Sequence, residues 1–214
     1  ETPKAAQLGR ELNINVIYNN EPITKDADFL LRFDAEGLGI TQMRPQKIGP
    51  VRVDFLSGEL GFRVRTLRSQ KQLLPRIFQL GPHLKKSGAH KSVRIADLTF
   101  GWGMDGWILA AAGAEVYACE RNPIMSALIK DGHYRAKDSP ISNRLHFFPG
   151  DAQKFYEQFQ EIKIDYVYID PMYPTRPGSA LPPGEIQLLQ NLIAPATETD
   201  DVLDALDTWK IWAI

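Results

Sequence analysis

The sequence is poor in cysteine and contains no long apolar run. Among its 214 residues there is one cysteine, Cys119, which excludes an internal disulfide framework, and the four histidines show no metal-ligand spacing with it. No stretch reaches the roughly 18 apolar residues of a membrane-spanning helix, and no charged-then-apolar leader is present. We therefore expect a cytoplasmic protein that holds no metal and has no membrane segment.

Net charge is also small, but the charged residues are unevenly distributed. The formal net charge is −1, yet nine basic residues and no acidic one lie between Leu60 and Ala96, whereas residues 151–214 hold eleven acids against four bases. Because lysine and arginine neutralise phosphates, the basic stretch is a candidate polyanion-binding surface. A solvated helix face is the alternative interpretation. The binding residues that we select from this stretch are Arg63, Arg65, Arg68 and Lys71.

The chain reads as two regions joined by a basic connector. Short β-like runs separated by turn signals predict a small β-rich subdomain over residues 1–57. These runs are residues 14–18, 29–33, 38–43 and 51–56. Residues 58–92 form the connector, in which 70–80 predicts a helix that Pro75 starts, kinks or splits. From 93 to 214 the pattern becomes strand, glycine-bearing turn, helix and strand, which predicts a Rossmann-like α/β domain.

Residues 93–123 predict the first βαβ unit of that domain. Its strands are residues 93–98 and 114–120, and its helix is residues 107–113. The turn between strand and helix contains Gly101 and Gly103, which let the backbone pass close to a ligand, and the helix points its N-terminus at that ligand. Glu120 ends the second strand, where an acid accepts hydrogen bonds from ribose hydroxyls. The unit therefore predicts a nucleoside-like cofactor.

The details of the turn decide which cofactor is expected. Residues 97–105 read D-x-T-x-G-x-G-x-D, with Thr99 in the third place, and so place an acid on the strand itself, unlike the dinucleotide motif. This turn is typical of S-adenosylmethionine methyltransferases. Asp97 can face the amino group of the methionine part, while backbone groups of the glycine loop surround its carboxylate. We expect S-adenosylmethionine as cofactor, with S-adenosylhomocysteine as product.

Two further strands end at acidic residues. Residues 145–148 lead to Asp151, where an acid commonly reads the adenine amino group, and the next strand ends at Asp170. Ligands of open α/β sheets lie outside the carboxyl ends of the strands. Each acid alone could be a helix N-cap or a loop charge, but five acids at consecutive strand ends favour one shared site. Those acids are Asp97, Asp105, Glu120, Asp151 and Asp170.

Two motifs, together with the turn, indicate a known family. "DPMYP" at residues 170–174 resembles the [D/N]-P-P-[F/Y] motif of methyltransferases that modify exocyclic amines of bases, and "ERNP" occupies 120–123. With "DG" at 131–132 and "SAL" at 179–181, the stretch from about 53 to about 192 resembles the ribosomal RNA small subunit methyltransferase J family. The resemblance implies a class I, Rossmann-like methyltransferase sheet with a small N-terminal β-rich subdomain. It also implies methylation of the exocyclic N2 of a guanine in small-subunit (16S) ribosomal RNA, as free RNA or in the assembled subunit.

Carried over by position, the resemblance implies specific site residues. Cofactor contacts fall on Met104, Asp105, Glu120, Arg121, Asp151, Ala152 and Asp170. The carboxylate of Asp170 and the carbonyl of Pro171 are implied to accept hydrogen bonds from the guanine amine, and Tyr173 to stack on the base. Met104 stands where the family usually has arginine, and the family continues beyond residue 214 through a basic strand.

Two other functions stay open. A DNA amino-methyltransferase would use the same motif, but it predicts a target-recognition insert that the sequence does not contain. A non-catalytic RNA- or nucleotide-binding module is the second, and Met104 favours it. Of the remaining residues, we assign Trp107 and Cys119 to the core and 185–194 to an amphipathic helix that covers the sheet.

Overall fold

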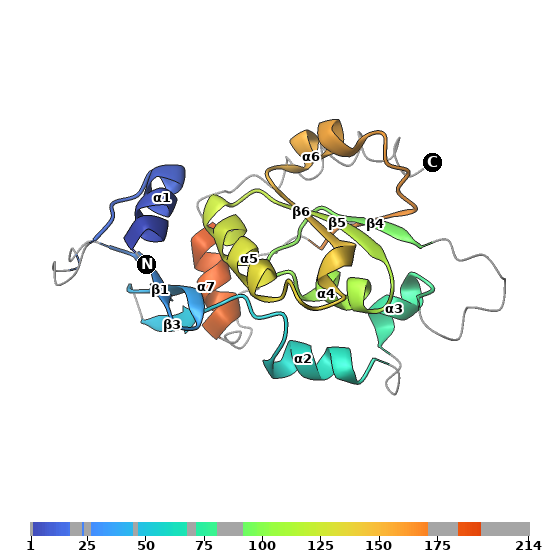
Figure 1. Cartoon of the computed structure of the whole chain (residues 1–214), viewed down its shortest axis with the longest axis horizontal. Coiled ribbons are helices and arrows are strands. Elements are labelled where there is room, and N and C mark those ends of the chain that lie inside the picture. The colour runs from blue at the N-terminus through green and yellow to red at the C-terminus, as the bar shows by residue number, and fades with distance from the viewer. Residues whose placement is uncertain are drawn as a thin grey trace, which may run out of the picture. The chain divides into compact units, whose positions relative to one another are not determined.

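The computed structural model describes residues 2–17, 23, 27–44, 47–67, 72–80, 92–170 and 184–193. Its elements form two compact units (Figure 1). The first contains the elements up to Val53 and the helix α7 (Gly184–Ile193), and the second runs from Asp54 to the strand β7 (Tyr166–Tyr168). The predicted boundaries at residues 57 and 92 stay a prediction. Within the described ranges, no helix is both long and apolar enough to cross a membrane.

The first unit is built on a three-stranded antiparallel sheet in the order β1-β2-β3. Its elements before α7 are α1 (Thr2–Leu12), β1 (Phe29–Asp34), β2 (Gly37–Gln42) and β3 (Ile48–Val51). Side chains alternate between the two faces of a strand, and on β2 Leu38, Ile40 and Gln42 are at most 2% exposed. α7 packs on β3, and Asn191 Nδ2 donates to Gln42 Oε1 at 2.9 Å. The α7 side of this sheet is therefore its core side.

Predictions for this region hold in part. The runs at 29–33 and 38–43 are confirmed as β1 and β2. The strand expected at 51–56 is wrong in position, because β3 runs earlier, through Gly49 and Pro50. No strand forms at 14–17, and residue 18 lies outside the described residues. The helix expected at 185–194 forms as α7, but it packs on the small sheet.

The second unit contains the predicted parallel sheet, in the order β6-β5-β4-β7. Its other strands and its main helices are β4 (Arg94–Asp97), α4 (Met104–Ala111), β5 (Glu115–Glu120), α5 (Pro123–Arg135), β6 (Leu145–Pro149) and α6 (Ala152–Phe159). The helices α4 and α5 lie on one face of this sheet and α6 on the other, as Figure 1 shows. The Rossmann-like class I prediction is confirmed. Because β5 and β7 flank β4 and the chain reverses its direction of travel there, a crevice is expected at the carboxyl ends of these strands.

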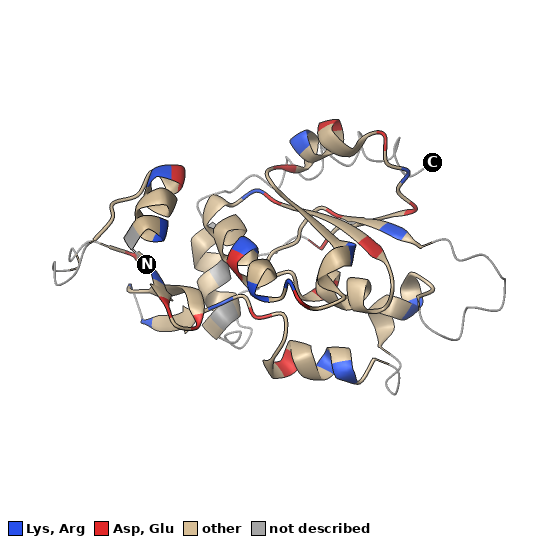
Figure 2. Cartoon of the chain, in the orientation of Figure 1, with Lys and Arg blue, Asp and Glu red and all other residues tan. Residues whose placement is uncertain are grey.

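The connector between the sheets is helical in two places. α2 (Gly58–Arg65) was not predicted, and its last turn carries Arg63 and Arg65 (Figure 2). The helix predicted at 70–80 is shorter, α3 (Leu73–Ile77), and Pro75 lies in its first turn, where a missing N–H costs nothing. A single 3₁₀ turn, η2 (Ser142–Arg144), precedes β6.

The parallel sheet of the second unit packs against α4 and against α6. Trp107 of α4 is fully buried and stacks on Phe55, with ring centroids 4.6 Å apart. Cys119 is 1% exposed and belongs to a buried cluster with Ala96, Ile164 and Phe155 of α6. Both packing assignments are confirmed. Burial raises the pKa of the Cys119 thiol above its ordinary value, so this cysteine stays protonated and behaves as a small apolar residue. The packing of α4 in turn fixes the direction of the glycine turn before it.

Candidate active site

The glycine turn between β4 and α4 is closely packed. Gly101 and Gly103 have φ angles of 52° and 75°, a left-handed conformation that favours glycine. An added Cβ at Gly103 would lie 2.5 Å from a ring carbon of Phe100, and one at Gly106 would lie 2.4 Å from the same ring. The turn therefore requires small residues, and it presents bare backbone at the start of α4. The first N–H groups of that helix have no acceptor within it.

Glu120 ends β5 directly beside this turn and is held in one orientation. Its Oε2 accepts the N–H of Gly101 at 3.0 Å, and its Oε1 accepts the N–H of Asn122 at 2.7 Å. Asn122 itself caps α5 by accepting two backbone N–H groups. Glu120 is only 8% exposed, and burial raises its pKa although the N–H donors oppose this shift. Each carboxylate oxygen keeps one further acceptor position.

Asp97 ends β4 and is 1% exposed. Its Oδ1 accepts the N–H of Thr99 at 3.2 Å. Burial raises the pKa of Asp97 to about 8, and the nearby charges of Asp105, Glu120 and Asp170 act in the same direction. A cation at this position would relieve the repulsion between these carboxylates. The site therefore suits a positively charged ligand.

Asp105, in the first turn of α4, contacts two other elements. The Tyr168 hydroxyl donates to its Oδ2 at 2.8 Å, and Arg63 Nη2 of α2 lies 3.8 Å from its Oδ1. Burial, followed by this hydrogen bond, raises the pKa of Tyr168 and keeps the hydroxyl a donor. Tyr168 was missed at the sequence level. Its signal is its place two residues before Asp170, which puts the two side chains on the same face of an extended strand.

Asp170 follows the carboxyl end of β7 and is exposed. Its N–H donates to Thr99 Oγ1 at 2.7 Å, and the N–H of Leu98 donates to the carbonyl of Tyr168 at 3.1 Å. The end of β7 is thus attached to the glycine turn. The structure brings six of the predicted residues together at this point, namely Asp97, Thr99, Gly101, Asp105, Glu120 and Asp170.

The other predicted cofactor residues occupy neighbouring but different positions. Asp151 is the N-cap of α6, where it accepts the N–H of Lys154 at 2.8 Å, and Ala152 is the first residue of that helix. The end of β6 is tied to β5, because the N–H of Gly150 donates to the carbonyl of Glu120 at 2.9 Å. Arg121 is exposed directly after Glu120. Met104 opens α4 and is 43% exposed.

Several predicted residues lie outside the described part of the chain. These are Pro171, Tyr173, Arg68 and Lys71. Of the basic residues that are described, Arg65 is exposed on α2 and Arg63 faces Asp105. Over the described ranges, no group of three or more His, Cys, Asp or Glu side chains is arranged to hold a metal ion.

The hydrogen-bonding groups and charges of this site fit S-adenosylmethionine, which carries a ribose diol, a carboxylate, an ammonium and a sulfonium. Glu120 offers acceptors for the diol at the tip of β5, beside a turn whose backbone carries no side chain at Gly101 and Gly103. Asp97 and its neighbouring carboxylates match the two positive groups. The indole N–H of Trp102, within the same turn, is buried and has no hydrogen-bond partner among the described residues.

Sequence comparison finds a family and several relatives. The profile of the family described as "Putative SAM-dependent methyltransferase" matches residues 16–209. Ribosomal RNA small subunit methyltransferase J of Pseudomonas paraeruginosa is 32% identical over 190 residues, covering 86% of this chain and 70% of the relative. The proteins of the same name from Thioalkalivibrio sulfidiphilus and Dechloromonas aromatica are each 30% identical, covering 94% and 87% of this chain and 77% and 75% of the relatives.

A solved structure agrees with the fold. A SAM-dependent methyltransferase from Neisseria gonorrhoeae superposes with a TM-score of 0.58 at 21% identity, covering 94% of this chain and 74% of the other. At this identity the likeness shows a shared fold.

Proposed function

The chain belongs to the ribosomal RNA small subunit methyltransferase J family of SAM-dependent methyltransferases, and we propose that it methylates the exocyclic N2 of a guanine in small-subunit ribosomal RNA. Membership confirms the resemblance given by the turn and the "ERNP" and "DPMYP" motifs, and it confirms S-adenosylmethionine as the cofactor. The target nucleotide and the roles of single residues are our proposal.

One observation carries the assignment of the cofactor residues. Glu120 and Asp97 lie buried at the tips of adjacent parallel strands, and the glycine turn passes between them with its Gly101 N–H on Glu120. In this proposal Glu120 binds the ribose hydroxyls and Asp97 faces the ammonium group. The backbone N–H groups of the first turn of α4, at Met104 and Asp105, receive the carboxylate. Arg121, Asp151 and Ala152 border the adenine.

Bound S-adenosylmethionine supplies an electrophilic methyl group on a sulfonium. The guanine amine is a poor nucleophile, because its lone pair is delocalised into the ring. In our proposal Asp170 and the carbonyl of Pro171 accept its two N–H bonds, which favours a tetrahedral nitrogen with its lone pair directed at the methyl group. Such positioning can supply several kcal/mol of the barrier lowering. The nitrogen gives up one proton as it gains the methyl, and Asp170 or water can accept it.

The guanine must be unstacked before it can reach this site. Enzymes that act on a base take it out of the helix or act on single strands, and proteins hold splayed RNA bases on aromatic faces. Tyr173 is the residue that we assign to stacking, and Arg63, Arg65, Arg68 and Lys71 to the flanking phosphates. The reaction is placed in the cytoplasm, on free ribosomal RNA or the assembled small subunit, and parallel assays on the two substrates separate these cases.

A variant at Asp170 tests the proposed chemistry. We expect Asp170→Ala to lower kcat on undermethylated small-subunit RNA by about 100-fold or more, because it removes an acceptor for the guanine amine in the transition state. The matched control is Asp138→Ala, the same chemical change at an exposed residue after α5. Binding of S-adenosylmethionine, followed by calorimetry, should persist in both. Unchanged kcat in Asp170→Ala would overturn the assigned role, and methylation of duplex DNA would favour the DNA alternative.

A further inference from the structure

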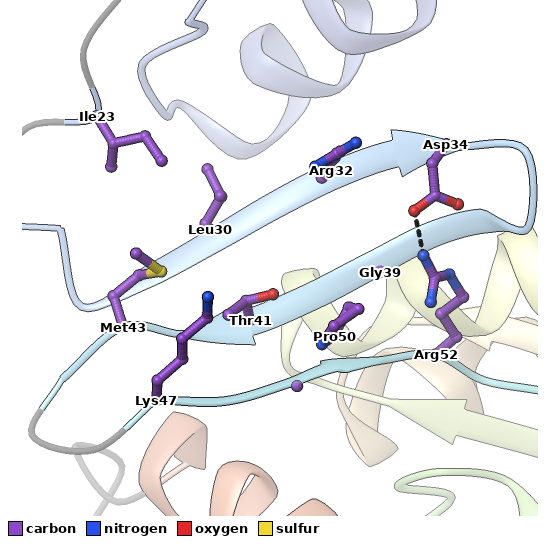
Figure 3. A pocket seen from close by; sticks show the side chains of 11 residues that line it. Ile23, Leu30, Arg32, Asp34, Gly39, Thr41, Met43, Lys47, Pro50 and Arg52 are labelled. Carbon is purple, nitrogen blue, oxygen red and sulfur yellow. Dashed lines mark hydrogen bonds and ion pairs between the residues drawn. The ribbon is translucent and has the colours of Figure 1, made fainter.

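The small antiparallel sheet carries a cavity of about 270 Å³ (Figure 3). Leu38, Ile40 and Gln42 of β2 point to the buried face of this sheet. The residues that alternate with them, Gly39 and Thr41, line the cavity on the opposite face. Their antiparallel partners on β1 are Arg32 and Leu30. The cavity is therefore built on the second face of the sheet, and its lining has no part in the site at the parallel strands.

Arg52 is a fixed cation in this cavity. Its side chain lies directly over Gly39, where an added Cβ would be 3.4 Å from three of its atoms. The guanidinium pairs with Asp34 through Nη2 and with Glu36 through Nη1, the latter at 3.1 Å. The arginine side chain is 15% exposed, and its buried Nε has no hydrogen-bond partner among the described residues. One donor of a preorganised arginine is thus left without an acceptor.

Two further cations, Arg32 and Lys47, line the same cavity. Arg32 and Lys47 are exposed, and neither makes an ion pair with any residue in the described part of the chain. Among the described lining residues the one acid is Asp34, which pairs with Arg52 and is also within electrostatic reach of Arg32. The described lining thus has an excess of positive charge around an apolar floor.

We propose that this cavity is a groove that binds the ribose-phosphate backbone of the RNA substrate. The proposal rests on the proposed function. Arg32 and Lys47 neutralise phosphates, Arg52 adds its fixed positive charge at the edge of the groove, and the sugars pack on Leu30 and Pro50. Among the described residues that line the cavity there is no aromatic side chain on which a base could stack. The groove therefore binds independently of sequence and depends strongly on salt.

The test is the salt dependence of RNA binding by the full chain. Fluorescence anisotropy with a labelled single-stranded RNA of roughly 16 nucleotides would compare the wild type with the Arg32→Gln/Lys47→Gln double variant. Losing two phosphate contacts should reduce the slope of log K against log salt by about 1.4 and weaken binding on the order of 20-fold at about 0.1 M salt. The matched control is Lys4→Gln/Arg10→Gln, which removes the same charge from exposed positions of α1 in the same unit.

The outcomes separate this proposal from the proposed function. Weaker RNA binding in the groove variant, with S-adenosylmethionine affinity and the control unchanged, supports the groove. RNA binding and salt slope equal to those of the wild type would overturn it, even if the wild type methylates ribosomal RNA. An equal loss in groove and control variants would also overturn it, since net charge alone would then explain the effect. If the wild type methylates no RNA but the groove variant still binds RNA more weakly, the groove stands and the proposed function fails.

Discussion

Asp97 shows how burial sets the charge of a single side chain. Burial raises its pKa from the usual 3.8 to about 8, with help from Asp105, Glu120 and Asp170. Over that pH interval the folded protein holds a proton that the unfolded chain has released. The stabilisation from this proton is complete below about pH 4 and is lost as pH rises through about 8.

The pH dependence of unfolding can isolate this residue. As pH rises from 5 to 8, we expect the cofactor-free wild type to lose stability relative to Asp97→Asn by about 1 kcal/mol per pH unit, because asparagine is always neutral. Urea unfolding of both proteins at several pH values measures the difference, and other titrating groups cancel in it. A difference that stays constant between pH 5 and 8 would contradict the raised pKa.

Gly103 and Gly113 form a natural pair at the two ends of α4. Both have positive φ, 75° and 108°, but an added Cβ at Gly103 meets Phe100 and Phe55, whereas nothing lies within 4 Å of one at Gly113. We expect Gly113→Ala to cost about 1 to 2 kcal/mol from backbone strain, and Gly103→Ala about 2 to 4 kcal/mol because overpacking adds to the strain. Thermal unfolding measures both. Equal losses of unfolding free energy in the two variants would show that the turn around Gly103 is less tightly packed than the structure indicates.

The sequence predicted a site residue correctly where its position at the end of a strand was sufficient to locate it in the fold. Asp97 and Glu120 could be placed because parallel strands end at a common edge, whatever the packing below them. Tyr168 and Arg63 could not, because their contacts with Asp105 join elements far apart in sequence. Arg52 was missed for the same reason. Its partner Asp34 lies across two strands, and only Gly39 between them gives a hint of the close approach.

At the level of elements, the attachment of β7 to the turn after β4 positions Asp170. The N–H of Asp170 donates to Thr99 Oγ1 at 2.7 Å. Thr99→Val keeps the shape but removes the acceptor, so we expect kcat to fall about tenfold, because small displacements of a reacting group are costly. KM for S-adenosylmethionine should change less than kcat, and Thr99→Ser should restore the rate. Failure of serine to restore it would indicate a purely structural role for the threonine.

Strands and helices were predicted best where the sequence has clear turn residues at their ends. The strands and helix of the first βαβ unit have glycine turns at their ends, and all three form close to the expected residues. β3 was displaced because Gly49 and Pro50 read as a turn, although a short strand can carry them where its backbone N–H is not needed. α2 was missed because Gly58 and Gly61 are poor helix formers. Gly61 is buried, and a Cβ there would collide with the carbonyl of Leu56, so packing decides its identity.

On the scale of the whole molecule, the two units carry different parts of the proposed function. The parallel sheet carries the cofactor residues and Asp170, and the small sheet carries a groove lined by Arg32, Lys47 and Arg52. Sequence could assign the first because its motifs are local. It could not assign the second, because that groove depends on strand register and on side chains with no shared motif.

The most direct test of the central claim is to identify the nucleoside that receives the methyl group. Full-length protein would be incubated with labelled S-adenosylmethionine and undermethylated small-subunit ribosomal RNA, which is then digested to nucleosides and analysed by mass spectrometry. We predict that the label appears in N2-methylguanosine and that Asp170→Ala yields little of it. Label in a methylated adenosine or cytidine, or no label while the cofactor still binds, would contradict the account.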